Sequence, residues 1–186
     1  MEKNSNWNLV LTLVTIGLVS AFVLTFVYQW TTPYIEANQA EIRRRAINEV
    51  LPGSEEFEEI NIDGEIFYEA YDEDNRQIGV ATQQTGAGYN GMIDVMVGVD
   101  IDDQRVLNIS IVNHEETPGL GARITEEEYK SHFQEKPFGD YQAVSTEPTD
   151  PMEVQIIAGA TISSEAVMEI VEAAVEKINT VYGGRL

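Results

Sequence analysis

The sequence predicts an α+β domain carried behind a single N-terminal transmembrane helix, and three hydropathy patterns support this fold class. Residues 4–35 carry no charged side chain. Residues 66–112 alternate apolar and polar side chains with a period of two, as β-strands do. Residues 167–178 repeat apolar side chains every three or four positions, as an amphipathic helix does. Strands followed by helices that pack on one side of their sheet are typical of α+β domains.

Residues 1–35 are expected to form a transmembrane anchor with a short N-terminal tail. Residues 9–28 are a nearly continuous apolar run, about as long as the 20 residues that a helix needs to cross a bilayer. Aromatic residues stand at both ends, as at membrane interfaces: Trp7 at one end and Tyr28, Trp30 and Tyr34 at the other. We therefore expect a single-pass protein of the cell membrane that contacts lipid.

A cleaved signal peptide is the alternative for this segment. It is disfavoured because the run is long, because Lys3 is the only basic residue before it, and because no clear cleavage site follows. Positive charge leaves the orientation open, since Lys3 lies on one side of the run and Arg43 to Arg45 lie on the other.

Residues 36–53 are expected to form a connecting helix that ends at Pro52 and Gly53. The acidic segment 54–59 is expected to be a loop. The domain proper is expected to occupy residues 54–186.

Four segments of the domain are expected to form an antiparallel meander, because turn-forming residues separate them. They are residues 66–71, 77–84, 92–101 and 106–112. A loop at 114–123, a short helix at 125–133 and a loop at 137–151 should follow. A last strand at 154–157 then leads to the C-terminal helix.

The composition excludes several classes of function. The formal net charge is −21, so a polyanion such as nucleic acid would be repelled. The same charge favours a basic docking partner. The chain has no cysteine, which excludes disulfides, zinc–thiolate sites and iron–sulfur clusters ligated by this chain.

The stretch from Ala158 to Ser164, with the sequence AGATISS, precedes the C-terminal helix and has two interpretations. Its Ser and Thr side chains suit a helix cap, because they can accept hydrogen bonds from free backbone N–H groups. The same N–H groups and the helix dipole suit a phosphate. The residues alone leave both open.

The loop from His114 to Gly121, with the sequence HEETPGLG, also has more than one interpretation. Pro118 and Gly119 predict a tight turn, and the two glycines allow a ligand to approach the backbone closely. His114 beside two carboxylates suits a metal ligand or a general base, whereas a solvated surface turn is the plainer alternative. The glycine-rich segment Gly86 to Gly91 matches a dinucleotide-binding fingerprint only superficially, because a strand and not a helix follows it.

Three motifs taken together resemble one family. After an anchor come GYNGMI (residues 88–93), HEETPGLG (114–121) and AGATISS (158–164), in this order. In this combination the chain resembles the membrane-anchored FMN-binding subunits of the Rnf and Nqr redox complexes, and in particular the G subunit of the Rnf electron-transport complex. The resemblance covers nearly the whole chain and implies an FMN-binding domain in residues 54–186.

The resemblance implies that FMN is linked covalently to Thr161 through a phosphoester, which a separate flavin transferase forms from FAD. Gly159 and Ala160 would leave room for the phosphate and for the transferase. The other implied cofactor contacts are Ile162, Ser163, Ser164, Glu116, Thr117, Gly119, Leu120, Gly121 and Tyr89. No residue of this chain is expected to be catalytic or to bind a metal. Two positions depart from the family's usual motif: Ala158 replaces Ser or Thr, and Gln155 replaces Asp.

The implied function is electron relay by the bound FMN within a membrane-bound, ion-translocating ferredoxin:NAD oxidoreductase complex. The implied partners are the other subunits of that complex, and the domain is expected to be extracytoplasmic. The alternative is a tethered binding or sensory domain of the same fold without covalent flavin. A hydrolase that uses Thr161, Ser163 or Ser164 with His114 as base is a third interpretation.

Overall fold

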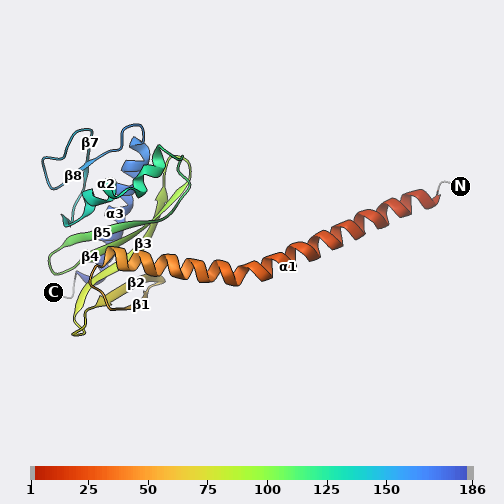
Figure 1. Cartoon of the computed structure of the whole chain (residues 1–186), viewed down its shortest axis with the longest axis horizontal. Helices are drawn as coiled ribbons and strands as arrows, with labels where there is room; N and C mark the ends of the chain where they lie inside the picture. Colours follow the sequence, from red (N-terminus) through yellow and green to blue (C-terminus); the bar gives the residue numbers. More distant parts are fainter. Residues whose placement is uncertain (1–2, 184–186) are drawn as a thin grey trace. The chain divides into compact units, whose positions relative to one another are not determined.

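The computed structural model describes residues 3–183, which divide into two compact units, one up to Ile42 and one from Arg43 onward. Helix α1 (Lys3–Val50) runs through the first unit and contributes its last eight residues to the second (Figure 1). The helix is long and apolar enough to cross a membrane, and the apolar stretch is not buried by other residues. The expected anchor and connecting helix are one continuous helix, which ends just before Pro52 and Gly53.

Six strands form an antiparallel sheet in the order β1-β2-β3-β4-β5-β6. The strands are β1 (Glu56–Ile62), β2 (Glu65–Tyr71), β3 (Gln77–Ala87), β4 (Met92–Asp100), β5 (Arg105–His114) and β6 (Lys136–Pro137). The predicted meander corresponds to β2 through β5 and is confirmed, with the long pairings of β4 against β3 and β5 at its centre.

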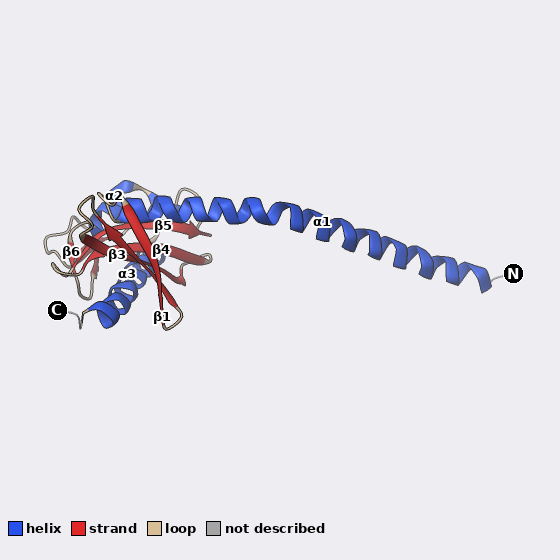
Figure 2. Cartoon of the chain, turned by 90° about the horizontal axis from the view of Figure 1, so that it is seen from below, coloured by secondary structure: helices blue, strands red, loops and turns tan. Residues whose placement is uncertain are grey.

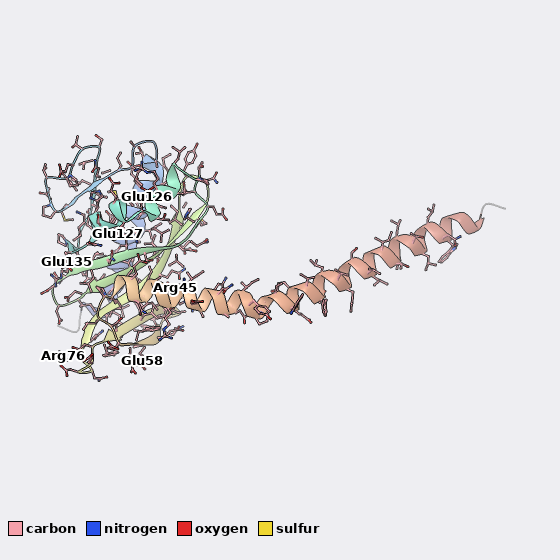
Figure 3. The ribbon with its side chains drawn as sticks, in the orientation of Figure 1. Arg45, Glu58, Arg76, Glu126, Glu127 and Glu135 are labelled. Carbon is pink, nitrogen blue, oxygen red and sulfur yellow. The ribbon has the colours of Figure 1, made fainter. Side chains whose placement is uncertain are left out.

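Strand β1 corrects one expectation, because the acidic segment 54–59 was expected to be a loop and most of it belongs to this strand. Here Phe57 packs edge-on against Tyr68 of β2, with ring centroids 6.1 Å apart, while Glu58 lies on the exposed side of this edge strand (Figure 3). Asp63 and Gly64 both have positive φ, 54° and 88°, and close the β1–β2 hairpin. Such an Asp-Gly turn matches the right-handed twist of the two strands.

The second half of the domain is less regular than expected. The predicted helix at 125–133 is a short α-helix, α2 (Glu127–Lys130), between the 3₁₀ turns η1 (Gly121–Thr125) and η2 (Ser131–Phe133). The expected last strand does not join the main sheet. It is β8 (Glu153–Gln155), and it pairs in parallel with β7 (Gln142–Val144), which lies in the segment expected to be a loop.

The sheet is covered on both faces, which corrects the expectation that helices pack on one side only (Figure 2). Helix α3 (Thr161–Tyr182) buries its predicted apolar stripe against one face, on which Phe67 and Val95 lie. The end of α1 covers the other face with Ala46, Ile47 and Val50, and with Leu51 just after it, packed on Tyr68 and Met96. Adjacent strand residues point to opposite faces, so β2 and β4 supply both cores.

Candidate functional site

A cleft of about 400 Å³ gathers most of the predicted cofactor residues from three separate segments. The segments are the β3–β4 connection, the loop after β5, and the start of α3. Its lining consists of Tyr89, Glu116, Thr117, Leu120, Gly121, Gly159, Ala160, Thr161, Ile162 and Ser163. Gly119 and Ser164 are the two predicted contacts that do not line it.

Helix α3 begins at Thr161, and its N-terminal residues form one wall of the cleft. The residue before it, Ala160, is the N-cap, and no side chain in the described part of the chain caps the helix, so the capping interpretation of this stretch is wrong. The first intrahelical bond runs from the Ser164 N–H to the Ala160 carbonyl, at 3.0 Å. The N–H groups of Thr161, Ile162 and Ser163 therefore have no partner within the helix.

The Thr161 side chain is exposed, and within residues 3–183 its hydroxyl makes no hydrogen bond. Gly159, two residues earlier, has a φ of +83°, which a residue with a side chain rarely adopts. This sharp turn brings the chain to the start of α3, where the exposed Thr161 lines the cleft.

Ser164 holds the turn at Gly159 in place by hydrogen bonds and does not line the cleft. It is fully buried, and its hydroxyl accepts a hydrogen bond from the Ile157 N–H and donates one to the Ala160 carbonyl, both at 3.0 Å. Its own carbonyl accepts a hydrogen bond from the Tyr129 hydroxyl at 2.8 Å. Burial raises the pKa of Tyr129, so its phenol stays protonated as this donor. Ser164 is thus a support for Thr161 and not a contact in the cleft.

The loop after β5 contains the predicted tight turn, which is confirmed. The Leu120 N–H donates to the Thr117 carbonyl at 3.2 Å, and Gly119 has a φ of +77°, as the third residue of a type II turn requires. The turn directs Leu120 outward. This residue is 51% exposed and lines the cleft. Tyr89 and Ile162 are exposed apolar neighbours on the other two segments.

Glu116 joins the three segments through its buried carboxylate. Its Oε1 accepts hydrogen bonds from the backbone N–H groups of Tyr89 at 2.7 Å and Asn90 at 3.1 Å. Its Oε2 accepts one from the Ser163 hydroxyl at 2.7 Å, on the first turn of α3. The sequence placed Glu116 among the cofactor contacts, but this linking role depends on partners 26 to 47 positions away and has no local signal.

Two glycines make room for this carboxylate. A Cβ on Gly88 would collide with its Oε1, and a Cβ on Gly121 would collide with its Oε2 and lie 2.7 Å from the Ser163 Oγ. Asn90 adds a contact that sequence reasoning missed, because its side-chain amide donates to the Glu115 carbonyl at 2.7 Å. The glycine-rich segment therefore serves to pack the loops together, consistent with the failure of the dinucleotide interpretation.

His114 lies near these residues but is not arranged for catalysis. Its Nδ1 accepts a hydrogen bond from the Glu116 N–H at 3.2 Å. The hydroxyls of Ser163 and Ser164 are committed to Glu116 and Ala160, so in the described part of the chain no hydroxyl at the cleft is bonded to a histidine. Within the same residues no group of three His, Cys, Asp or Glu side chains is placed to hold a metal ion.

A larger cavity, of about 600 Å³, lies elsewhere, beside the start of β3 and the end of β4. Asp100, Asp102 and Asp103 contribute to its lining, together with Gly79 and Tyr182. It contains none of the predicted cofactor residues, and its carboxylates would repel a phosphate. The smaller cleft is therefore the candidate site.

Comparison with known proteins points to the same region. The FMN-binding domain family matches residues 88–176, which include all three segments of the cleft. The G subunit of the ion-translocating oxidoreductase complex of Methanosarcina acetivorans is 31% identical over 94% of this chain and 95% of its own length. The G subunit of the proton-translocating ferredoxin:NAD(+) oxidoreductase complex of Clostridium ljungdahlii is 29% identical over 99% and 97%.

Two further comparisons extend this result. The G subunit of the Na(+)-translocating ferredoxin:NAD(+) oxidoreductase complex of Acetobacterium woodii is 29% identical over 89% of this chain and 88% of its own length. The crystal structure of Shewanella oneidensis NqrC shares the fold, with a TM-score of 0.57 at 19% identity over 74% of this chain and 71% of that chain. The relatives thus include both proton- and Na(+)-translocating systems.

Proposed function

The chain belongs to the family of G subunits of ion-translocating oxidoreductase complexes, and from this premise we propose that Thr161 carries FMN as a covalent phosphoester. The family makes the chain an FMN-binding electron-transfer subunit of a membrane complex. The proposal adds three points: the covalent bond, a ferredoxin:NAD oxidoreductase as the host complex, and a domain on the extracytoplasmic side. A flavin transferase would install the cofactor.

One observation carries the proposal: the exposed Thr161 lines a cleft with apolar walls, beside N–H groups that have no partner within α3, and among residues 3–183 its hydroxyl makes no hydrogen bond. The N–H groups at a helix N-terminus and the helix dipole favour a phosphate. The exposed side chains of Leu120, Tyr89 and Ile162 suit the flat ring of a flavin. The residues present therefore fit FMN at both of its ends.

The bound FMN would supply the electron chemistry, and the protein would supply position and electrostatics. We assign the phosphate to the backbone of Ile162 and Ser163, with Gly159 and Ala160 leaving access to it. We assign the ring to the outer side of the Thr117–Leu120 turn, with Leu120 against its face and Gly121 below. Gly119 would act by shaping that turn. Ser164 would act only by fixing the turn before Thr161.

Intact mass and in-gel flavin fluorescence of the full-length protein, co-expressed with a flavin transferase, test the covalent bond. The transferase reaction joins the Thr161 oxygen to the FMN phosphorus of FAD and releases AMP, so the adduct equals FMN less one water. We expect this adduct in the parent and in Thr161→Ser, which keeps a hydroxyl, and its absence in Thr161→Ala. Thr180→Ala, at an exposed position on the same helix, is the matched control and should stay loaded.

An unmodified parent, after a cognate transferase had also been supplied, would overturn covalent attachment and favour the flavin-free binding domain. Retention of the adduct in Thr161→Ala would move the attachment to another residue. Turnover of an ester substrate that depended on Thr161 would instead favour the hydrolase.

The membrane orientation is tested separately, and the absence of cysteine makes the test simple. Thr146→Cys places one thiol at an exposed position of the domain. A membrane-impermeant maleimide added to intact cells should label it if the domain is extracytoplasmic. Labelling only after the cells are broken would place the domain in the cytoplasm.

A further inference from the structure

The Glu116 carboxylate lies in the wall of the cleft, with only 5% of the residue exposed. We propose that Glu116 holds a fixed negative charge beside the flavin and thereby lowers the flavin's reduction potential. This inference rests on the proposed function. It changes the role of Glu116 from a cofactor contact to a source of electrostatic tuning.

The contacts of Glu116 suit an ionised carboxylate. Its side chain receives three hydrogen bonds, from the N–H groups of Tyr89 and Asn90 and from the hydroxyl of Ser163. Backbone N–H groups can only donate, and donors stabilise the charged form of a carboxylate. Ser163 stands in the first turn of α3, where the helix dipole also favours negative charge.

The same contacts keep the charge in place. The donors come from two separate segments of the chain, and the two oxygens lie against Gly88 and Gly121, where an added Cβ would collide with them. A charge on a mobile, exposed side chain would be screened by water, but a buried charge is screened much less. The electrostatic field of this carboxylate therefore reaches the cleft with little screening.

The direction of the effect follows from the charge that reduction adds. Electrons that enter the flavin make it more negative, and a nearby carboxylate raises the free energy of that form. Glu116 also neutralises part of the positive end of α3, which would otherwise favour the reduced cofactor. Both effects make the flavin harder to reduce.

Glu116→Gln removes the charge with little change of shape. The amide oxygen of Gln can accept from the Tyr89 and Asn90 N–H groups, and its NH₂ can donate to the Ser163 hydroxyl, which accepts as well as it donates. The links between the three segments can thus persist without the charge. A purely structural role predicts no shift of the potential in this variant.

The test is a spectroelectrochemical titration of the flavin in full-length protein, after intact mass has confirmed that each variant is loaded. We expect Glu116→Gln to raise the ratio of reduced to oxidised flavin about tenfold at a fixed potential, which is about 30 mV for a two-electron couple. Glu169→Gln removes an exposed charge about two turns along α3 from Thr161. It should change the ratio of reduced to oxidised flavin less than twofold.

Ser163→Ala provides a second variant with the opposite sign. It keeps the Glu116 charge but removes a donor that partly compensates it, so the ratio of reduced to oxidised flavin should fall about twofold. This variant decides the question if Glu116→Gln fails to fold or to load. A general loosening of the site would not produce shifts of opposite sign in the two variants.

An unchanged ratio in a loaded Glu116→Gln protein would overturn the inference while leaving covalent FMN intact. A ratio that stayed constant or rose in Ser163→Ala would overturn it as well. Absence of the FMN adduct from the parent protein is a different result, because intact mass shows it before any titration. That result would overturn the proposed covalent attachment itself.

Discussion

Glu49 and Lys130 form an ion pair that joins the end of α1 to α2, although 81 positions separate them in the sequence. The Lys130 side chain is 11% exposed, and its Nζ also lies 3.0 Å from the carboxylate of Glu127, which stands on α2 in Figure 3. The second oxygen of Glu49 accepts a hydrogen bond from the Ser110 hydroxyl of β5 at 2.6 Å. Tyr129, the neighbour of Lys130, bonds to the first turn of α3, so α2 contacts both covering helices.

Replacement of Lys130 by Met should destabilise the domain by about 1–3 kcal/mol, because it removes the buried ammonium group whose charged hydrogen bond joins α2 to Glu49. Urea unfolding of the detergent-solubilised protein measures this free energy. Arg76→Met is the control, since Arg76, labelled in Figure 3, is 73% exposed in its pairs with Asp72 and Asp74, and such pairs contribute about 0–1 kcal/mol. Equal effects of both variants would contradict the special role of Lys130.

Alkaline pH should destabilise the domain through buried tyrosines. Burial raises the pKa of Tyr129 and of Tyr141 above the ordinary value of 10.0. The unfolded chain therefore loses these phenol protons first, so their contribution to stability is complete below pH 10.0 and is lost as the pH rises above it. Urea unfolding at a series of pH values should show this decline, and Tyr129→Phe should make it shallower. A free energy of unfolding that stayed flat above pH 10.0 would contradict it.

Gly98 of β4 allows the end of α1 to pack closely on the sheet. A Cβ at this position would collide with the Val50 carbonyl oxygen and lie 2.7 Å from its carbon. Gly98→Ala should therefore cost about 1–3 kcal/mol of stability, as overpacking does. Gly17→Ala is the matched control, because its Cβ would meet nothing within 4 Å in α1. Equal losses of stability in the two variants, measured by thermal or urea unfolding, would contradict this role of Gly98.

Sequence reasoning identified the elements whose signals are local. The apolar stripe of α3, the central meander and the turn at Pro118 and Gly119 all follow from spacing within a few residues. Strand β1 was missed because the four glutamates from Glu55 to Glu59 mask the weak apolar pattern of an edge strand. The Asp63-Gly64 turn was the available signal, since that dipeptide favours a two-residue hairpin loop.

The parts of the site that were not predicted depend on long-range contacts. The motifs identified the loops around the cleft, but no local pattern shows that Glu116 reaches Ser163 or that Tyr129 reaches Ser164. Ser164 was expected to offer its backbone N–H to the phosphate, but that N–H donates to the Ala160 carbonyl at 3.0 Å as the first hydrogen bond of α3. Its hydroxyl is also buried beneath the helix start, where it bonds to Ile157 and Ala160.

Leu120 provides a test of where the flavin ring lies. If its exposed side chain covers one face of the ring, Leu120→Ala should open that face to solvent without loss of the covalent bond. Stern–Volmer titration with a neutral quencher measures this access, and the constant should rise about twofold as the covering apolar contact is removed. A neutral quencher is required because the net charge of −21 would repel an anionic one.

Met92→Ala is the matched control for this measurement. Met92 is 50% exposed, close to the 51% of Leu120, but it does not line the cleft. Its truncation should leave the quenching constant unchanged, because no side chain is removed from the site. Equal quenching of the parent and Leu120→Ala, with both fully loaded, would place the ring away from the Thr117–Leu120 turn. The phosphoester at Thr161 would then have to direct the ring outward from α3 on a side that Leu120 does not reach.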